Sequence, residues 1–312
     1  MSHRGKLILS FTTVCLAWGA SYFAISIGLK SMPPFLMGFL RYGLAGAFLW
    51  AWCEVRGLER PTVRQWISQA ILGMLFVVLG NGTVLWVEQT VPSGITALIV
   101  AIGPLWTILL EWALGMRRRP NLASWIGLVL GASGVTLLVG GTGAGTVAPL
   151  PIAVLVLGTI AWSLGSNLSL KFERPASPLR AVSAQMITGA FVLGLMGLAT
   201  GEAGASHWGH VGLPAILALG YLILVASISA YIAYGWLIHN VSPTAAGACS
   251  YVNPAIAVLL GAAFGEPIGW RQFGALAMIL IGVSMLSRAE LKRTKAPEPV
   301  ALLPEELAGN AA

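Results

Sequence analysis

The chain is poor in charge and lacks aspartate altogether. Only 9% of its 312 residues are charged, and all eleven acidic residues are glutamate. A soluble domain carries about 25% charged residues, whereas here 57% are hydrophobic and the mean hydropathy is +0.82. This composition excludes an ordinary soluble protein and indicates one that crosses a membrane many times. No stretch gathers acidic ligands, so we expect neither a metal nor a cofactor.

Cysteine and catalytic motifs are equally scarce. The three cysteines, Cys15, Cys53 and Cys249, lie in or at the ends of apolar runs without CxxC spacing, which argues against a zinc site or a disulfide framework. The sequence contains no nucleophile elbow, Walker motif or HExxH, so we do not expect an enzyme. The net charge of +7 would suggest a nucleic-acid partner in a soluble protein. Here the basic residues lie in loops on one side, so no such partner is expected.

Apolar runs of membrane-spanning length fill most of the chain. A spanning helix needs about 20 apolar residues, and the connections between runs are too short to hold a soluble domain. We therefore predict an all-α membrane protein with ten transmembrane helices and a disordered cytoplasmic tail over 288–312. The ten runs are 7–29, 35–55, 66–88, 94–115, 122–139, 150–170, 180–200, 211–238, 243–264 and 270–287.

The distribution of Lys and Arg predicts the orientation of these helices. With an intracellular N-terminus, fifteen of the 18 basic residues fall on the cytoplasmic side and only Lys30 and Arg271 fall outside. The remaining one, Arg41, lies within a run. Short cytoplasmic loops carry an excess of Lys and Arg, so both termini are predicted to be cytoplasmic.

The sequence also repeats itself with matching interruptions. The stretch 80–115 recurs at 230–265, an offset of 150, and the second run carries an internal proline in both copies. Five helices per copy is an odd number, so residues 1–145 and 146–287 are predicted to form inverted repeats, as in many transporters. A proline within a helix removes a hydrogen bond and bends it, so Pro104 and Pro254 are predicted hinges. The pairs at this offset include Trp86 and Trp236, Pro104 and Pro254, and Gly115 and Gly265. Trp18 and Trp162 match at an offset of 144.

These residues resemble a known family of carriers. The Ala17-Trp18 pair, Pro33-Pro34-Phe35 with Phe39-Leu40-Arg41-Tyr42-Gly43, the two proline-containing runs and the closing Gly134-Val135 and Gly282-Val283 pairs resemble the ten-helix, EamA-type branch of the drug/metabolite transporter superfamily. The resemblance covers about residues 7–287. It implies a bacterial inner-membrane carrier, often an exporter, of amino acids or related metabolites, with a central cavity lined by helices 1, 3, 4, 6, 8 and 9. The Trp-rich first halves also resemble the aromatic amino-acid exporters.

Polar and aromatic side chains recur at helical spacing in five of the runs. Such groups are costly against lipid, so they are expected to face the bundle interior and to close a chamber near the two prolines. For any single serine or threonine, packing between helices is the alternative. The predicted substrate-binding residues are Trp18, Tyr22, Asn81, Trp162, Ser166, Asn167, Ser227, Tyr231, Tyr234, Tyr251 and Asn253.

Arg41, Glu88 and Glu111 are the ionisable residues of the runs that could take part in transport. Arg41 and Glu88 fall at the same predicted depth, and we expect an ion pair, because a charge in the membrane needs a partner. A purely structural pair and a role for Arg41 in binding a substrate carboxylate both stay open. Glu111 is expected to pair with the basic cluster at Arg117, with proton coupling as the alternative.

The sequence favours a secondary carrier, acting as a monomer in the lipid bilayer, for amino acids or related small metabolites. Transport would proceed by alternating access around the central cavity. The alternative is a multidrug exporter of lipophilic cations, which would need a carboxylate deep in the cavity. A membrane-embedded enzyme or a sensor would need clustered catalytic groups or a signalling domain, and the sequence shows neither.

The topology can be tested with reporter fusions. Reporters placed after Arg118 and after Ala289 should both read cytoplasmic, and one within 141–148 should read external, because each follows from the positive-inside count. A cytoplasmic signal from the fusion within 141–148 would break the inverted repeat.

Overall fold

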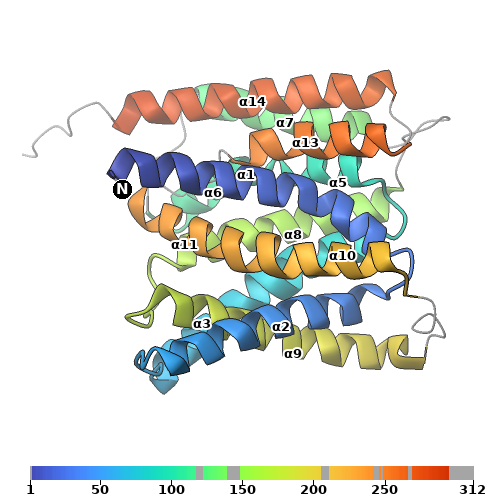
Figure 1. Cartoon of the computed structure of the whole chain (residues 1–312). Helices are drawn as coiled ribbons and strands as arrows, with labels where there is room; N and C mark the ends of the chain where they lie inside the picture. The colour runs from blue at the N-terminus through green and yellow to red at the C-terminus, as the bar shows by residue number, and fades with distance from the viewer. Residues whose placement is uncertain are drawn as a thin grey trace, which may run out of the picture.

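The regular structure of the chain is entirely helical over the residues that the computed structural model describes, which are 2–116, 122–138, 148–204, 211–241, 246, 249–265 and 269–294 (Figure 1). The helices are α1 (His3–Gly28), α2 (Pro34–Val55), α3 (Val63–Gly73), η1 (Met74–Asn81), α4 (Gly82–Val87), α5 (Ser93–Val100), α6 (Gly103–Ala113), α7 (Leu122–Leu138), α8 (Pro149–Leu168), α9 (Pro178–Ala199), η2 (Glu202–Gly204), α10 (Leu213–Tyr221), η4 (Leu222–Ser229), α11 (Ala230–Asn240), α13 (Cys249–Ala263) and α14 (Trp270–Thr294).

Many of these helices are long and apolar enough to cross a membrane, which confirms the predicted class of all-α membrane protein. Seven segments meet this standard, and three shorter apolar helices accompany them at Trp125–Gly134, Val252–Ala263 and Phe273–Gly282. Large apolar side chains such as Leu157 and Leu217 project from the bundle surface, as contact with lipid requires. The seven segments are His3–Gly28, Pro34–Val55, Val63–Val87, Ser93–Ala113, Pro149–Leu168, Pro178–Ala199 and Leu213–Asn240.

Helix ends follow from proline and glycine. Pro34 and Pro178 stand in the first turn of α2 and α9, where the missing N–H is no loss. The same two helices end just before Gly57 and Gly201, which have φ of 62° and 77°. This left-handed conformation is easy only for glycine and ends a helix. Both pairs are 144 residues apart, which is the offset found in the sequence between Trp18 and Trp162.

Two membrane-length segments contain a π-helical stretch that the sequence does not predict. Segment Val63–Val87 contains η1, and segment Leu213–Asn240 contains η4; each stretch is eight residues long. π-helical turns are rare and are often found at functional sites. The starts of the two stretches lie 148 residues apart, so these interruptions also recur in the two halves.

The two predicted hinge prolines lie in different surroundings. Pro104 stands in the first turn of α6, directly after a break at residues 101–102 that separates α6 from α5. Pro254 lies inside α13 without such a break. The expected interruption by proline is therefore a full break of the helix in the first half and a proline within a continuous helix in the second.

The two halves interlock through their first helices. α1 packs against α10, η4, α11 and α13 of the second half, and α8 packs against η1, α4, α5 and α6 of the first half. α2 packs against α9, and α7 packs against α14 (Figure 1). Each half thus contributes its first helix to the surface formed by the other, and the centre of the bundle lies between α1 and α8.

The basic connections meet at one end of the bundle, which we call the basic end. There Arg64 pairs with Glu173 at 3.1 Å, and Lys171 donates to the Leu114 carbonyl at 3.3 Å. The ring of His3 lies 5.7 Å from that of Trp236, so α1 begins at this end too. The sequence predicts these segments to be cytoplasmic, and their meeting at one end agrees with that prediction.

Helix α2 is held at both ends by residues of the second half. At its N-terminus, the Glu202 carboxylate accepts hydrogen bonds from the amides of Phe35 and Leu36 at 3.3 and 2.9 Å. At its C-terminus, the buried Arg180 pairs with Glu54 at 3.0 Å and donates to the Leu58 carbonyl just beyond the helix at 2.9 Å. An anion at a helix N-terminus and a cation at its C-terminus both favour the helix dipole, so this arrangement fixes α2 against the antiparallel α9.

Several predictions fall partly or wholly outside the described residues. These include the loop 141–147 and the basic cluster at 117–119 expected to pair with Glu111. Of the predicted disordered tail, residues 288–294 belong to α14 and are helical, and 295–312 lie outside the described residues.

Loss of the Glu202 carboxylate should loosen the α2–α9 joint. Pro33, the residue before α2, gives no side-chain cap, so Glu202→Ala leaves two amides without their acceptor. We expect a loss of about 0.5–2 kcal/mol of stability, measured as a lower midpoint of thermal unfolding in detergent. Glu59→Ala, at an exposed position near the opposite end of α2, is the control and should leave the midpoint unchanged. An equal midpoint for both variants would contradict the capping role.

Candidate functional site

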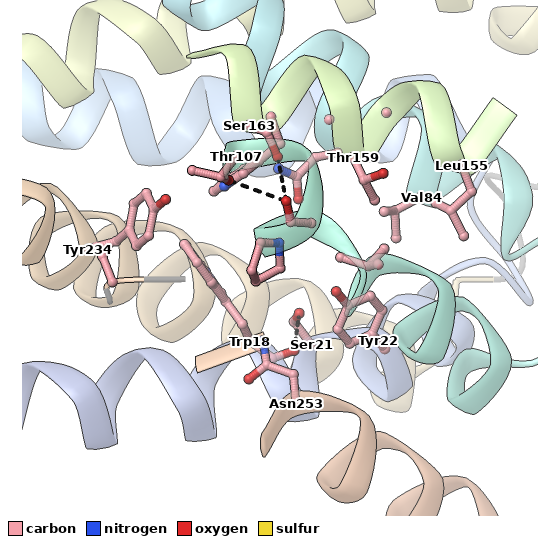
Figure 2. A pocket seen from close by; sticks show the side chains of 18 of the residues that line it. Trp18, Ser21, Tyr22, Val84, Thr107, Leu155, Thr159, Ser163, Tyr234 and Asn253 are labelled. Carbon is pink, nitrogen blue, oxygen red and sulfur yellow. Dashed lines mark hydrogen bonds between the residues drawn. The ribbon is translucent and has the colours of Figure 1, made fainter. Parts of the chain in front are cut away.

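A central cavity lies between α1 and α8. It offers about 90 Å³ to the centres of water-sized molecules and is partly open to the surroundings, so it has room for more than a single water, which needs about 10–15 Å³ on the same measure. Figure 2 shows side chains from several helices converging on it. The described lining residues are Trp18, Ser21, Tyr22, Ile25, Gly80, Asn81, Val84, Val100, Gly103, Pro104, Thr107, Leu155, Gly158, Thr159, Trp162, Ser163, Tyr234, Ala246 and Asn253.

About half of the predicted substrate-binding residues line the central cavity. Among the predicted substrate-binding residues, the lining includes Trp18, Tyr22, Asn81, Trp162, Tyr234 and Asn253, together with the predicted hinge Pro104. Ser166, Asn167, Ser227 and Tyr231 are buried behind this lining. Pro254 is buried in α13 next to Asn253, and the side chain of Tyr251 lies outside the described part of the structure.

Four of the predicted rings form one aromatic cluster, made of Trp18, Trp162, Tyr231 and Tyr234. The Trp18 and Trp162 rings, from equivalent positions of the two halves, meet edge to face with centroids 5.3 Å apart. Trp18 also lies 5.0 Å from Tyr234 and 5.7 Å from Tyr231. Edge-to-face and tilted pairs at this spacing are attractive beyond the area they bury, so the cluster joins α1, α8 and α11 at the centre of the bundle.

Hydrogen bonds fix the orientation of these rings. The indole N–H of Trp18 donates to the Ala226 carbonyl at 3.0 Å, within η4. The Asn81 amide donates to the Tyr231 hydroxyl at 2.9 Å, and the Tyr234 and Ser166 hydroxyls are 3.0 Å apart. Asn81 and Tyr231 are 150 residues apart, so this contact too joins equivalent positions of the two halves. Buried polar groups are thereby satisfied and the rings are held in place.

A group of hydroxyls on the opposite wall was not predicted. Ser163 Oγ and Thr107 Oγ1 both donate to the Gly103 carbonyl, at 2.9 and 3.2 Å (Figure 2). Asn167 Nδ2 donates to the Thr107 carbonyl at 3.1 Å. These bonds hold the start of α6, after the break, against α8. Thr159 and Ser163 precede the predicted Asn167 at four-residue intervals, and this spacing along α8 is the signal that would have identified the two hydroxyls.

Arg41 has a partner that the sequence does not name. It is 1% exposed, its Nε donates to Ser227 Oγ at 2.9 Å, and its guanidinium lies 4.6 Å from the centre of the Tyr42 ring. Glu88 is also buried, at the end of α4. The contact with Ser227 connects α2 to η4, and the ion pair with Glu88 stays a prediction.

A second cavity, the basic-end cavity, lies beyond the aromatic cluster. Trp162 and Tyr234 line both cavities, so their rings form a shared wall. The space on the far side is lined by polar side chains that include Gln69 of α3, Gln185 of α9 and Arg174 of the connection between α8 and α9. The aromatic cluster therefore separates the central cavity from a cavity at the basic end.

The chain is similar to known transporters along nearly its whole length. Residues 5–140 and 149–288 each match the EamA-like transporter family. Over 276 residues, 86% of this chain and 88% of the other, the sequence is 35% identical to that of the uncharacterized inner membrane transporter YedA of Escherichia coli K12. Over 281 residues, 86% and 91% of the two chains, it is 24% identical to that of a probable amino-acid metabolite efflux pump of Salmonella typhimurium.

A likeness in fold extends to a solved structure. One crystal structure, 23% identical in sequence, matches with a TM-score of 0.67 over 95% of this chain and 100% of its own. The arrangement of helices in this chain is therefore one that proteins are known to adopt.

Substitution of Arg41 tests its partners. We expect Arg41→Gln to lower the yield of folded protein, since breaking a buried ion pair costs on the order of 3–5 kcal/mol. If Glu88 is the ionic partner, the double change Arg41→Gln with Glu88→Gln should recover much of the yield, measured by size-exclusion chromatography in detergent. Ser227→Ala removes only the neutral contact and should cost less. A well-folded Arg41→Gln variant without transport would instead support a carboxylate-binding role.

Proposed function

Because the chain belongs to the EamA-like transporter family, within the drug/metabolite transporter superfamily, we propose that it carries amino acids or related zwitterionic metabolites across the inner membrane, where the protein resides. The observation that supports this substrate class is the chemistry of the central cavity. Its described lining combines aromatic rings, hydroxyls and amides and contains no Asp, Glu, Lys or Arg. A wall of this kind suits a ligand that is polar but has no net charge.

The hydroxyls of the lining are placed to receive an ammonium group. Ser21, Thr107, Thr159 and Ser163 each donate their single hydrogen to a backbone carbonyl. A hydroxyl that donates its hydrogen keeps its lone pairs as acceptors, so what these residues offer a ligand is acceptor oxygen. The nearby rings of Trp18 and Trp162 add cation–π attraction of about 0.5–2 kcal/mol.

The carboxylate of a zwitterion needs hydrogen-bond donors instead. The Tyr22 hydroxyl and the amide group of Asn253 also line the central cavity and are the groups we assign to it. The apolar side chain of the substrate would rest against the indole and phenol rings. Aromatic and large apolar amino acids fit this lining best.

A multidrug exporter of lipophilic cations is the second candidate, and the lining disfavours it. Such a substrate would be held by a carboxylate, and the two candidates are Glu88, directly after the segment Val63–Val87, and Glu111, within the segment Ser93–Ala113. Both are buried, but neither belongs to the described lining of the central cavity. The absence of charge in that lining is the feature that separates the two candidates.

The packing of helices supports alternating access of a particular kind. The halves are proposed to be inverted five-helix repeats, 1–145 and 146–287, and the reciprocal packing of α1 and α8, the recurring glycine ends and the two family matches support this. Since α1 packs on the second half and α8 on the first, each moving body would contain helices of both halves. The basic end would face the cytoplasm, and the aromatic cluster would part to let the substrate pass.

The transport function is tested by uptake into liposomes. We expect Trp18→Ala, Trp162→Ala, Tyr231→Ala and Asn253→Ala to fold but to reduce phenylalanine flux at least tenfold. A tenfold loss corresponds to about 1.4 kcal/mol, within the range of a lost aromatic contact or buried hydrogen bond. Flux of labelled phenylalanine should be measured with and without an imposed proton gradient.

Trp112→Ala is the matched control, because Trp112 is 40% exposed and meets only the neighbouring Trp125 among ring contacts of the described residues. It should transport normally. Full flux from all four cavity variants would contradict the proposed site. Transport of tetraphenylphosphonium rather than phenylalanine by the unmodified protein would favour the multidrug exporter.

A further inference from the structure

An arginine side chain, that of Arg174, lines the basic-end cavity. The cavity offers about 330 Å³ to the centres of water-sized molecules and is partly open to the surroundings. Arg174 lines it from the connection between α8 and α9, and its Nη1 lies 2.6 Å from Nδ1 and 2.7 Å from Nε2 of His239. The guanidinium therefore rests on the imidazole edge through one nitrogen, and a guanidinium has five N–H donors in all.

Other arginines at the same end are engaged with carboxylates. Arg60 pairs with Glu54 at 3.2 Å, Arg64 with Glu173 at 3.1 Å, and Arg180 with Glu54 at 3.0 Å. Arg174 has no carboxylate partner among the described residues. A surplus of basic residues in cytoplasmic loops explains that an arginine is present here. This surplus does not explain why Arg174 lines a cavity without a carboxylate partner among the described residues.

The remaining walls of the cavity suit an organic anion with an apolar body. Phe76, Trp162, Tyr231 and Trp236 provide aromatic surface, and the described lining contains no Asp or Glu. Gln185 Nε2 donates to Gln69 Oε1 at 2.7 Å, and Gln69 Nε2 donates to the Glu173 carbonyl at 3.2 Å. These two amides are satisfied within the protein, so Arg174 is the strongest donor left for a ligand.

We propose that the basic-end cavity is a second binding site, which takes the carboxylate of a small apolar or aromatic molecule on Arg174. A guanidinium binds a carboxylate through two parallel hydrogen bonds, and the donors not directed at His239 are available for this. The aromatic body of the ligand lies against Trp162 and Tyr231, on the opposite side of the shared wall from the central cavity. The site binds ligand while the aromatic cluster is closed.

This placement makes the site the loading position for cargo at the basic end, a role that rests on the proposed transport function. A zwitterion held there by its carboxylate has its side chain against the rings that must part. The central cavity then receives the ammonium on its acceptor oxygens. The two cavities thus divide the recognition of one molecule, with the carboxylate bound first on Arg174. Binding of a carboxylate to Arg174 does not itself depend on transport.

Binding of a carboxylate and of its uncharged amide tests the site. The probes are 3-phenylpropionate and 3-phenylpropionamide, which differ only in the group that Arg174 would hold, titrated into the full-length protein in detergent at constant ionic strength. Intrinsic fluorescence reports binding, because Trp162 and Trp236 line the cavity. We expect the carboxylate to bind about tenfold more tightly, as a hydrogen-bonded ionic contact implies.

Variants assign that preference to one residue. Arg174→Gln and Arg174→Met should each abolish the preference for the carboxylate, and Arg174→Lys should keep part of it, because lysine retains the charge without the fork. Arg64→Gln is the matched control, an exposed arginine at the same end that does not line the cavity, and it should bind both probes as the unmodified protein does. Since Arg174 is exposed, these changes should leave the unfolding midpoint unaltered.

Three results would overturn the site: no preference in the unmodified protein, an unchanged preference without Arg174, or an equal loss in Arg64→Gln. Phenylalanine flux separates the site from its role. If the Arg174 variants lose the probe preference but the unmodified protein does not transport phenylalanine, the site stands and only the loading role is removed. Normal flux and an unchanged probe preference in Arg174→Gln would reject the inference and leave the transport function intact.

Discussion

The exchange of first helices between the halves is the constraint on which the rest of the structure depends. α1 lies on the surface of the second half and α8 on that of the first. Trp18 and Trp162 are thereby brought into edge-to-face contact at 5.3 Å, although 144 residues separate them. Without this exchange neither half could complete its own wall of the central cavity. The cavity therefore belongs to the pair of halves and to neither one alone.

Sequence reasoning predicted the centre of the molecule better than its periphery. Polar and aromatic residues inside an apolar run have few places to go in a membrane, and this alone predicted that Trp18, Trp162, Tyr231 and Tyr234 would face inward. Their mutual contacts in the structure follow from the repeat. The membrane-length helices were equally predictable from the sequence, because the length of an apolar run is a direct signal.

The features that escaped prediction depend on partners far away in the chain. Arg180 was counted only as a loop charge and Glu202 received no role, because their function at the two ends of α2 appears only once α9 packs beside it. The same holds for Ser227, whose contact with Arg41 spans 186 positions. The π-helical stretches have no composition that distinguishes them from neighbouring α-helix. The break before α6 was anticipated as a bend at Pro104. The hydrogen bond from the Ser163 hydroxyl to the Gly103 carbonyl could not be inferred without the fold.

The π-helical stretches η1 and η4 have a consequence for the register of two helices at the centre. A π-helical turn bonds to the fifth residue along the chain and an α-helical turn to the fourth. Rewinding such a stretch into α-helix shifts every following residue by one position, a rotation of about 100°. Asn81 ends η1, and Tyr231 lies two residues beyond η4, so the two partners of one hydrogen bond each follow a segment of this kind. A helix so built is able to turn the side chains that follow the stretch away from the cavity, while the part before the stretch keeps its register.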